Sequence, residues 1–158
     1  MLRLKSTRGF TLVELMITLA LLAIVATIAV PNFVQFIRNN QVQAKADELK
    51  TFLQYARGQA VATRKSYELT TGADAWSIKP VGGDIERSLE LNSAQAAAIS
   101  SIASVTFMPN GSVVAAAAIT VCRDQDAGNG YFIEIQRSGV IKMQPRGVDV
   151  PAKCEVKK

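Results

Sequence analysis

Few residues of this chain have the type and spacing that catalysis or metal binding needs. The 158 residues include no histidine, the side chain that most often acts as a general base near neutral pH. A metal site would depend on carboxylates and on the two cysteines, Cys122 and Cys154. Gly128 and Gly130 lack the third glycine and the following helix that a phosphate-binding loop requires. We therefore expect no enzymatic activity, no metal and no cofactor.

Glu14 is the one charged residue whose position is chemically unusual. The stretch from Phe10 to Ile37 holds 21 apolar residues in 28, and Glu14 carries its only charge. A carboxylate in hydrocarbon costs about 2.5 to 3.5 kcal/mol on insertion scales unless it is paired or neutralised. Glu14 therefore either lies close enough to the membrane edge to reach water or has a cationic partner.

The segments around Glu14 divide the chain into three parts. Residues 1–9 are basic and contribute three of the charges in the net +5. Residues 10–37 end in 23 consecutive uncharged positions, enough to span a bilayer and longer than the apolar core of a secretory signal. Residues 38–158 mix apolar and charged residues in the proportions of a small water-soluble domain.

The run from Arg8 to Leu15 reads Arg-Gly-Phe-Thr-Leu-Val-Glu-Leu. It resembles the processing signal of class III signal peptides, which type IV pilins and the pseudopilins of type II secretion carry. The resemblance implies that a prepilin peptidase cleaves after Gly9 and methylates the new N-terminus, Phe10. Glu14 then becomes the fifth residue of the mature chain, where the family's glutamate is thought to pair with the N-terminal amine of a neighbouring subunit.

The same resemblance implies a location and a set of partners. Cleavage in front of the apolar segment leaves this segment attached as both membrane anchor and assembly helix. We expect a single pass through the bacterial inner membrane with a periplasmic head, followed by entry into a pilus filament or its tip at the cell surface. The implied partners are the prepilin peptidase, other minor and major pilins, the inner membrane and the pilus assembly platform.

One long helix is predicted from Phe10 to about Thr63. After Arg38 the apolar residues follow spacings of three and four, which place them on one helix face that should pack against a sheet. They are Val42, Ala46, Leu49, Leu53, Ala56 and Ala60. Pro31 lacks a backbone donor and crowds the preceding turn, so we expect a kink or local unwinding there.

The remainder of the chain predicts short strands and turns. Alternating apolar residues indicate a hairpin that joins 67–71 to 76–78, and further strands at 105–107, 119–121, 131–136 and 140–143. Pro-Asn-Gly-Ser at 109–112 predicts a turn, and Ser138-Gly139 predicts a two-residue hairpin loop. Residues 93–101 are expected to form a helical turn or a loop, and residues 128–130 a loop.

This arrangement of a long helix, a β-rich head, the Pro-Asn-Gly-Ser turn and a late hairpin is similar to the FimT/FimU and GspH branch of minor pilins and pseudopilins. The resemblance implies an α+β pilin fold, in which the N-terminal α-helix packs on a C-terminal antiparallel β-sheet head. A periplasmic head lies in an oxidising compartment, where a structural disulfide between Cys122 and Cys154 is expected. Such a disulfide contributes roughly 3 to 4 kcal/mol in the chain-entropy model. A free buried thiol and a redox pair are the alternatives, and the absence of a C-x-x-C motif disfavours the redox pair.

The C-terminal tail is basic, with a net charge of +4 over residues 137–158. Some relatives of the FimT type bind DNA in natural transformation and share an arginine-rich Gly-Arg-x-Arg stretch near the C-terminus. The comparable place here, residues 145–148, reads Pro-Arg-Gly-Val and holds one arginine instead of two. Contact of Arg146, Lys153 and Lys157 with nucleic acid is therefore the weaker interpretation, because lysines at a chain end more often serve solvation.

Three functions follow as hypotheses. The first is a minor pilin of a type IV pilus that is incorporated at or near the tip and helps to initiate assembly. The second is a GspH-like minor pseudopilin of a type II secretion system, and the third is a FimT-like minor pilin that binds DNA. The N-terminal segment is common to all three, so only the head and the filament that contains it separate them.

Overall fold

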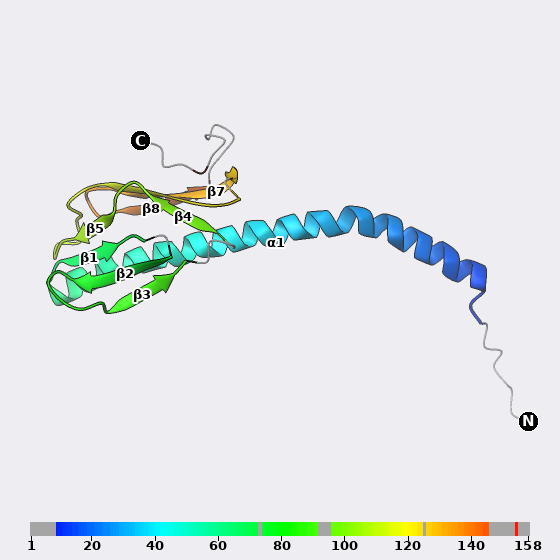
Figure 1. Cartoon of the computed structure of the whole chain (residues 1–158), viewed down its shortest axis with the longest axis horizontal. Coiled ribbons are helices and arrows are strands. Elements are labelled where there is room, and N and C mark those ends of the chain that lie inside the picture. Colours follow the sequence, from blue (N-terminus) through cyan, green and yellow to red (C-terminus); the bar gives the residue numbers. More distant parts are fainter. Residues whose placement is uncertain (1–8, 73, 92–95, 125, 146–153, 155–158) are drawn as a thin grey trace, which may run out of the picture. The chain divides into compact units, whose positions relative to one another are not determined.

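The structure is a computed structural model of the chain that describes residues 9–72, 74–91, 96–124, 126–145 and 154 (Figure 1). The chain forms two compact units, one that ends at Ile37 and one that begins at Arg38. Helix α1 (Leu12–Thr63) spans 52 residues and is followed by eight strands within the described residues. The predicted fold class is confirmed, since this one long helix packs through its C-terminal half on antiparallel sheets.

Helix α1 begins and ends close to the predicted positions, and both ends have local causes. Thr11 is the N-cap, because its Oγ1 accepts a hydrogen bond from the backbone N–H of Glu14 at 3.2 Å. Glu14 lies in the first turn, where the helix dipole favours a negative charge. The helix ends at Thr63 because Arg64 adopts a left-handed conformation with φ of 56°.

Pro31 lies inside α1, and the helix continues through it without interruption. Of the two expected alternatives, local unwinding does not occur here, and the kink stays a prediction. Asn32 donates a side-chain hydrogen bond to the backbone carbonyl of Ile28 at 3.0 Å, which supplies an additional donor within the turn that contains the proline. Membrane helices accept proline where such side chains satisfy nearby backbone groups.

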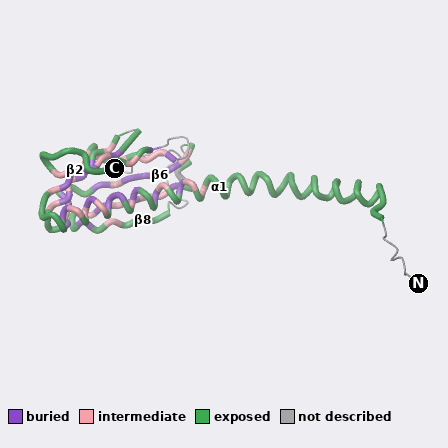
Figure 2. The backbone as a smooth tube through the Cα atoms, turned by 90° about the horizontal axis from the view of Figure 1, so that it is seen from below, coloured by how far each residue is buried: buried purple, intermediate pink, exposed green. Residues whose placement is uncertain are grey.

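The C-terminal half of α1 carries the predicted apolar stripe, and all six of its residues are buried in the core (Figure 2). Phe52 is also buried, next to Leu53, although the three-and-four spacing does not include it. Strand residues from both sheets contribute to the same core, among them Trp76, Phe107 and Ile133. The helix therefore supplies one side of a single core that the head completes.

The first sheet contains four strands in the order β3-β2-β1-β5. Its strands are β1 (Tyr67–Thr70), β2 (Ala75–Pro80), β3 (Arg87–Glu90) and β5 (Ser104–Phe107). The predicted hairpin is confirmed, since β1 and β2 are antiparallel neighbours in which Leu69 pairs with Ile78. Both residues are fully buried, which fixes the register because a shift of one residue would expose them.

The second sheet has the order β4-β6-β7-β8. Its strands are β4 (Ala97–Ser100), β6 (Ala117–Arg123), β7 (Asp126–Ile135) and β8 (Ile141–Pro145). Two sequence predictions are wrong here. Part of 93–101 forms β4, because its backbone pairs with β6, while 92–95 lie outside the described residues. Residues 128–130 belong to β7 and are not a loop.

The connection from β7 to β8 also differs from the prediction. Gln136 donates its backbone N–H to Val140 at 3.0 Å, which leaves the three residues 137–139 in the loop, where two were expected. Gly139 has φ of 79°, and Gly139 N–H donates to the carbonyl of Gln136 at 2.8 Å. A type I turn followed by a left-handed glycine is the usual three-residue hairpin.

Candidate assembly surface and processing site

The first described residues, Gly9 and Phe10, precede the helix and are exposed. A Cβ atom added to Gly9 would meet no atom within 4 Å among the described residues, so their packing does not require glycine at this position. Phe10 is 69% exposed. The peptide bond between them therefore lies in non-helical, accessible backbone, immediately before the Thr11 cap.

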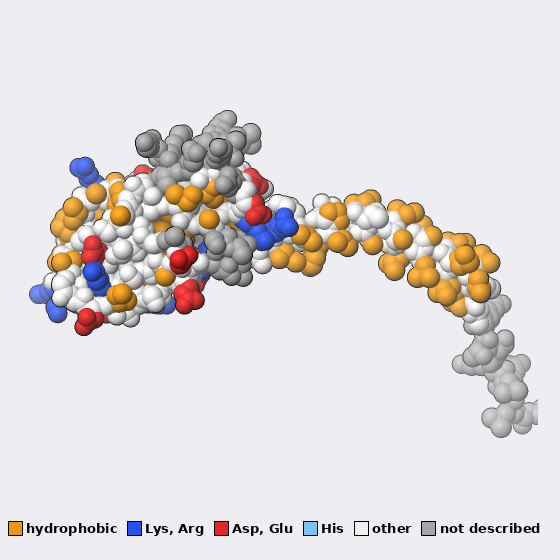
Figure 3. Space-filling model, viewed as in Figure 1, with side chains coloured by type: hydrophobic (Ala, Val, Ile, Leu, Met, Phe, Trp, Pro, Cys, Tyr) orange, Lys and Arg blue, Asp and Glu red, His pale blue; other side chains and the backbone are white. Residues whose placement is uncertain are grey.

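Glu14 lies three residues after Thr11, on a part of the helix that carries no other charge. No Lys or Arg nitrogen lies within 4.0 Å of its carboxylate among the residues that the structure describes. The part of α1 before Arg38 is exposed along its length, and large apolar side chains cover it (Figure 3). A buried cationic partner for Glu14 would therefore have to come from outside the described residues.

This exposed part of α1 has the length and composition of a membrane-spanning segment. A run of 18 residues in this part of the helix has a mean hydropathy of 2.5, and none of these residues is buried. The residues from Leu12 to Ile37 cover about 39 Å at 1.5 Å per residue, more than the hydrocarbon core of a bilayer. An apolar surface of this size needs either lipid or other protein around it.

The predicted disulfide is confirmed. Cys122 of β6 is bonded to Cys154, their Cα atoms are 6.2 Å apart, and both residues are buried. Cys122 lies in the second sheet, where its backbone pairs with that of Ala97 in β4. The disulfide therefore holds Cys154 against this sheet. The other predicted tail residues, Arg146, Lys153 and Lys157, lie outside the described residues.

Two titratable side chains of the head, Tyr67 and Arg87, make contacts within the fold. The Tyr67 hydroxyl donates to the Glu86 carboxylate at 3.0 Å, and burial is the main cause that raises the pKa of Tyr67. The Arg87 guanidinium lies 4.9 Å from the centre of the Tyr55 ring. No group of three or more Asp, Glu or Cys residues with metal-binding geometry occurs in the described part of the chain.

Sequence reasoning missed one junction that joins the helix to both sheets. The Arg57 Nε donates to the carbonyl of Gly111 at 2.9 Å, and Val113 N–H donates to the carbonyl of Arg137 at 3.0 Å. Gly111 and Gly139 are in such close contact that a Cβ on Gly139 would clash with the Gly111 carbonyl. In the sequence, Gly111 and Gly139 each predict a turn. Neither glycine predicts that the two turns touch.

Two family models match the sequence. The model of the type II transport protein GspH matches residues 45–139, and the model of the prokaryotic N-terminal methylation motif matches residues 4–30. A fimbrial protein of Pseudomonas aeruginosa is 29% identical over 130 residues, which cover 77% of this chain and 82% of that protein. The type IV major pilin PilA of Myxococcus xanthus is 52% identical over 46 residues, 29% of this chain, but these span only 19% of the pilin's own length.

Solved structures show the same fold. The crystal structure of the type IV minor pilin FimU of Pseudomonas aeruginosa matches with a TM-score of 0.64 and 25% identity, over 76% of this chain and 99% of the FimU chain. The minor pseudopilin EpsH of the type II secretion system of Vibrio cholerae matches with a TM-score of 0.56 over 66% of this chain and 97% of its own. The EpsH identity is 7%, so that likeness shows the fold alone.

Proposed function

The chain belongs to the family of the type II transport protein GspH, and on this premise we propose that it is a minor pilin of a type IV pilus. In this proposal it is incorporated at or near the pilus tip and helps to initiate assembly. The observation that carries the proposal is the likeness to the minor pilin FimU, which covers 76% of this chain at 25% identity and a TM-score of 0.64. The match to the model of the type II transport protein GspH favours the second candidate, a minor pseudopilin of type II secretion.

The methylation motif at residues 4–30 implies processing by a prepilin peptidase. We assign the cleaved bond to Gly9 and Phe10, whose backbone is exposed and not helical. Cleavage here removes the basic leader and leaves a new amine at Phe10, four residues before Glu14. The membrane segment stays attached, so the processed chain keeps the apolar surface with which it enters the filament.

Glu14 is assigned the role of an assembly residue. Its carboxylate has no cationic partner within 4.0 Å in the described chain, and the surrounding helix surface is apolar. Pairing with the N-terminal amine of a neighbouring subunit removes most of the cost of burying this charge. It also sets the axial position of the subunit, because a shift along the filament leaves both charges unpaired.

The membrane placement follows from the same helix. The apolar part of α1 precedes Arg38, and the folded head with its disulfide follows it. We propose a single pass through the inner membrane, with the head in the periplasm until the chain passes through the assembly platform into the pilus. Other pilins are the neighbours in that filament.

The test replaces Glu14 by Ala in the native bacterium, with Glu134→Ala in the head as the matched control. Glu14→Ala should still be cleaved after Gly9 but should be at least tenfold depleted from sheared surface pili, and the number of pili should fall. Glu134→Ala should behave like the wild type. Wild-type incorporation of Glu14→Ala would overturn the assembly role, and recovery of the chain only from periplasmic pseudopili would favour the second candidate.

A further inference from the structure

The large aliphatic side chains that the head exposes gather at one of its ends. Six such residues occur among the described residues from Arg38 onward, and all but Ile99 belong to the end of α1 or to the β2–β3, β5–β6 and β7–β8 loops. These five are Val61, Val81, Ile85, Val114 and Val140. The segments that carry them form what we name the distal surface, residues 57–66, 79–87, 107–116 and 136–141.

Defined contacts bring the four segments of the distal surface together. Val81 N–H donates to the carbonyl of Ser66 at 2.9 Å, which joins the β2–β3 loop to the end of α1. A Cβ atom on Gly111 would lie 3.1 Å from Cγ2 of Val61, and Gly111 is also in close contact with Gly139. The end of α1 and the three loops therefore meet at one end of the head.

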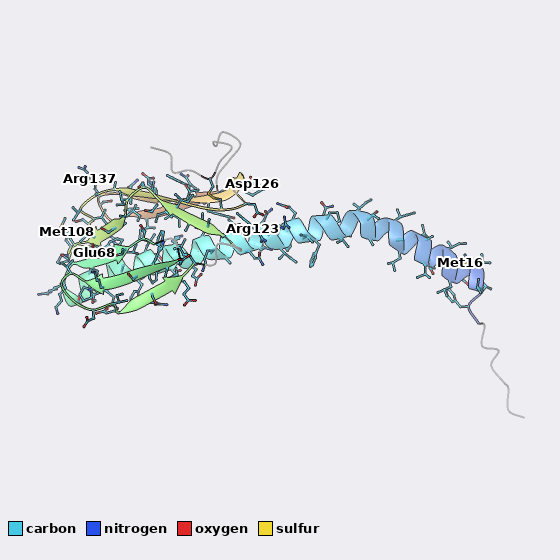
Figure 4. The ribbon with its side chains drawn as sticks, viewed as in Figure 1. Met16, Glu68, Met108, Arg123, Asp126 and Arg137 are labelled. Atoms are coloured by element: carbon cyan, nitrogen blue, oxygen red, sulfur yellow. A yellow bond between two sulfur atoms is a disulfide. The ribbon has the colours of Figure 1, made fainter. Side chains whose placement is uncertain are left out.

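The C-terminal tail is attached at the other end of the head. Figure 4 shows Arg137 at the end that carries the distal surface and Arg123 at the opposite end. Pro145 ends β8 at the far end of the hairpin from the β7–β8 loop, and Cys154 is bonded to Cys122, the neighbour of Arg123. The chain thus leaves β8 and returns to the disulfide away from the distal surface, whose four segments consist of described residues throughout.

The distal surface also has an excess of positive charge. Within its four described segments, five cations and two anions form no ion pair, which leaves a net charge of +3. The anions are Asp84 and Glu86, and three of the cations are exposed residues of the β7–β8 loop or of the end of α1, namely Arg64, Lys65 and Arg137. Basic and apolar side chains lie beside one another at this end of the head (Figure 3).

The folding of the head does not account for these exposed aliphatic groups. Val81, Ile85 and Val114 are each at least 60% exposed, and none of the five residues belongs to the core. Single exposed aliphatic residues are normal, whereas a group of them in one place marks a site for a protein or a membrane. Aliphatic groups next to Lys and Arg suit an anionic bilayer, because they enter the boundary below the headgroups while the cations contact lipid phosphates.

A protein partner and nucleic acid match the distal surface less well. Protein interfaces favour aromatic residues and contain few lysines, and proteins that bind single strands stack bases on exposed aromatic rings. Phe107 is the one aromatic residue of the four described segments, and it is fully buried. Duplex DNA binds mainly through its phosphates, to which aliphatic side chains add nothing.

We propose that the distal surface binds an anionic lipid bilayer, with Val81 and Ile85 inserted below the headgroups and with Lys65 and Arg137 at the lipid phosphates. Helix α1 rises about 38 Å from Arg38, where the head begins, to its end at 1.5 Å per residue. The bilayer is therefore a second membrane and not the one that holds the apolar half of α1. This binding goes beyond the proposed function, since it gives the head a ligand of its own.

The test uses the full chain in nanodiscs of phosphatidylcholine, so that the apolar half of α1 is already surrounded by lipid. The discs are mixed with separate vesicles, either of phosphatidylcholine alone or of phosphatidylcholine with an equal part of phosphatidylglycerol. Flotation of the vesicles then measures how much of the chain they carry with them. Discs without protein show the background.

Two variants separate the apolar contribution from the charged one. Val81→Ser with Ile85→Ser removes aliphatic groups, and Lys65→Glu with Arg137→Glu reverses two charges. All four side chains are exposed, so both variants should keep the thermal stability of the wild type. The matched controls lie outside the distal surface and are Ile99→Ser and Lys50→Glu.

The wild type should float at least tenfold more with the anionic vesicles than with phosphatidylcholine vesicles, and added salt should weaken this binding. Each distal variant should lose at least tenfold of it, while both controls should bind like the wild type. Absence of wild-type binding would overturn the proposal. Full binding of Val81→Ser with Ile85→Ser would also overturn it, and an equally strong interaction with duplex DNA would then identify a general polyanion site. The assay contains no filament, so its result is independent of pilus incorporation.

Discussion

The two halves of α1 have the same secondary structure and opposite surroundings. The half before Arg38 exposes its apolar side chains, and its only charge is Glu14. The half from Arg38 to Thr63 buries one apolar stripe against two sheets and presents polar residues on its other faces. Helix formation and burial are therefore independent in this chain. The packed half is stabilised within the head, and the exposed half needs lipid or other subunits around it.

The largest expected effect is on the free energy of unfolding of the head, when one leucine is replaced by alanine in either half of α1. Leu53→Ala should lower the free energy of unfolding of the head by about 2.7 to 5.0 kcal/mol, because Leu53 is fully buried and its loss leaves a cavity. Leu22→Ala should leave it within about 0.5 kcal/mol, because Leu22 is 64% exposed. Denaturant unfolding followed by fluorescence of the buried Trp76 measures both. Equal effects would show that the exposed half also stabilises the head.

Removing the disulfide tests a second contribution that only the head contains. Cys122→Ala with Cys154→Ala should lower the free energy of unfolding by about 2 to 4 kcal/mol, because the unfolded chain loses its closed loop. Reducing agent should weaken the wild type by a similar amount and leave the double variant unchanged. Wild-type stability that is insensitive to reduction would contradict a structural role for this bond.

A glycine exchange tests the junction between the helix and the two hairpin turns. Gly139→Ala should destabilise the head by about 1 to 3 kcal/mol, because φ is +79° and the new Cβ would clash with the Gly111 carbonyl. Gly58→Ala is the matched control, since it lies in α1 with open space around it and should stabilise the helix by about 0.5 to 1 kcal/mol. Thermal unfolding of the wild type and the two variants measures these changes in stability. An unchanged stability of Gly139→Ala would contradict the close contact of the turns.

The smallest expected effect on stability concerns Tyr67, which is buried in the head. Its pKa is raised from 10.0, so the folded state favours the neutral hydroxyl. Stability from this group is fully present below pH 10 and is lost as the pH rises through the raised pKa. Tyr67→Phe should therefore reduce the loss of stability above pH 10, which urea unfolding at a series of pH values measures. Parallel pH profiles for the two proteins would contradict the assignment.

Sequence reasoning predicted the elements whose periodicity is local. The α1 stripe from Val42 to Ala60, the β1–β2 hairpin and the turn at Gly111 all follow from residue spacing and turn chemistry. The prediction failed at Ala97–Ser100, where an alanine-rich segment with helical propensity became a strand because its backbone pairs with β6. It also failed at 128–130, where three turn-forming residues continue the long strand β7.

Residue composition and spacing specify the long apolar segment, the position of Glu14, the N-terminal methylation motif and the helix that carries the core stripe. All of these depend on residues close together in the chain, which composition and spacing report directly. The strand order, the contact of Arg57 with the Gly111 turn and the close contact of Gly111 with Gly139 emerge only in the tertiary structure. Those features join residues far apart in the sequence, and only the folded backbone brings their charges and carbonyl groups together.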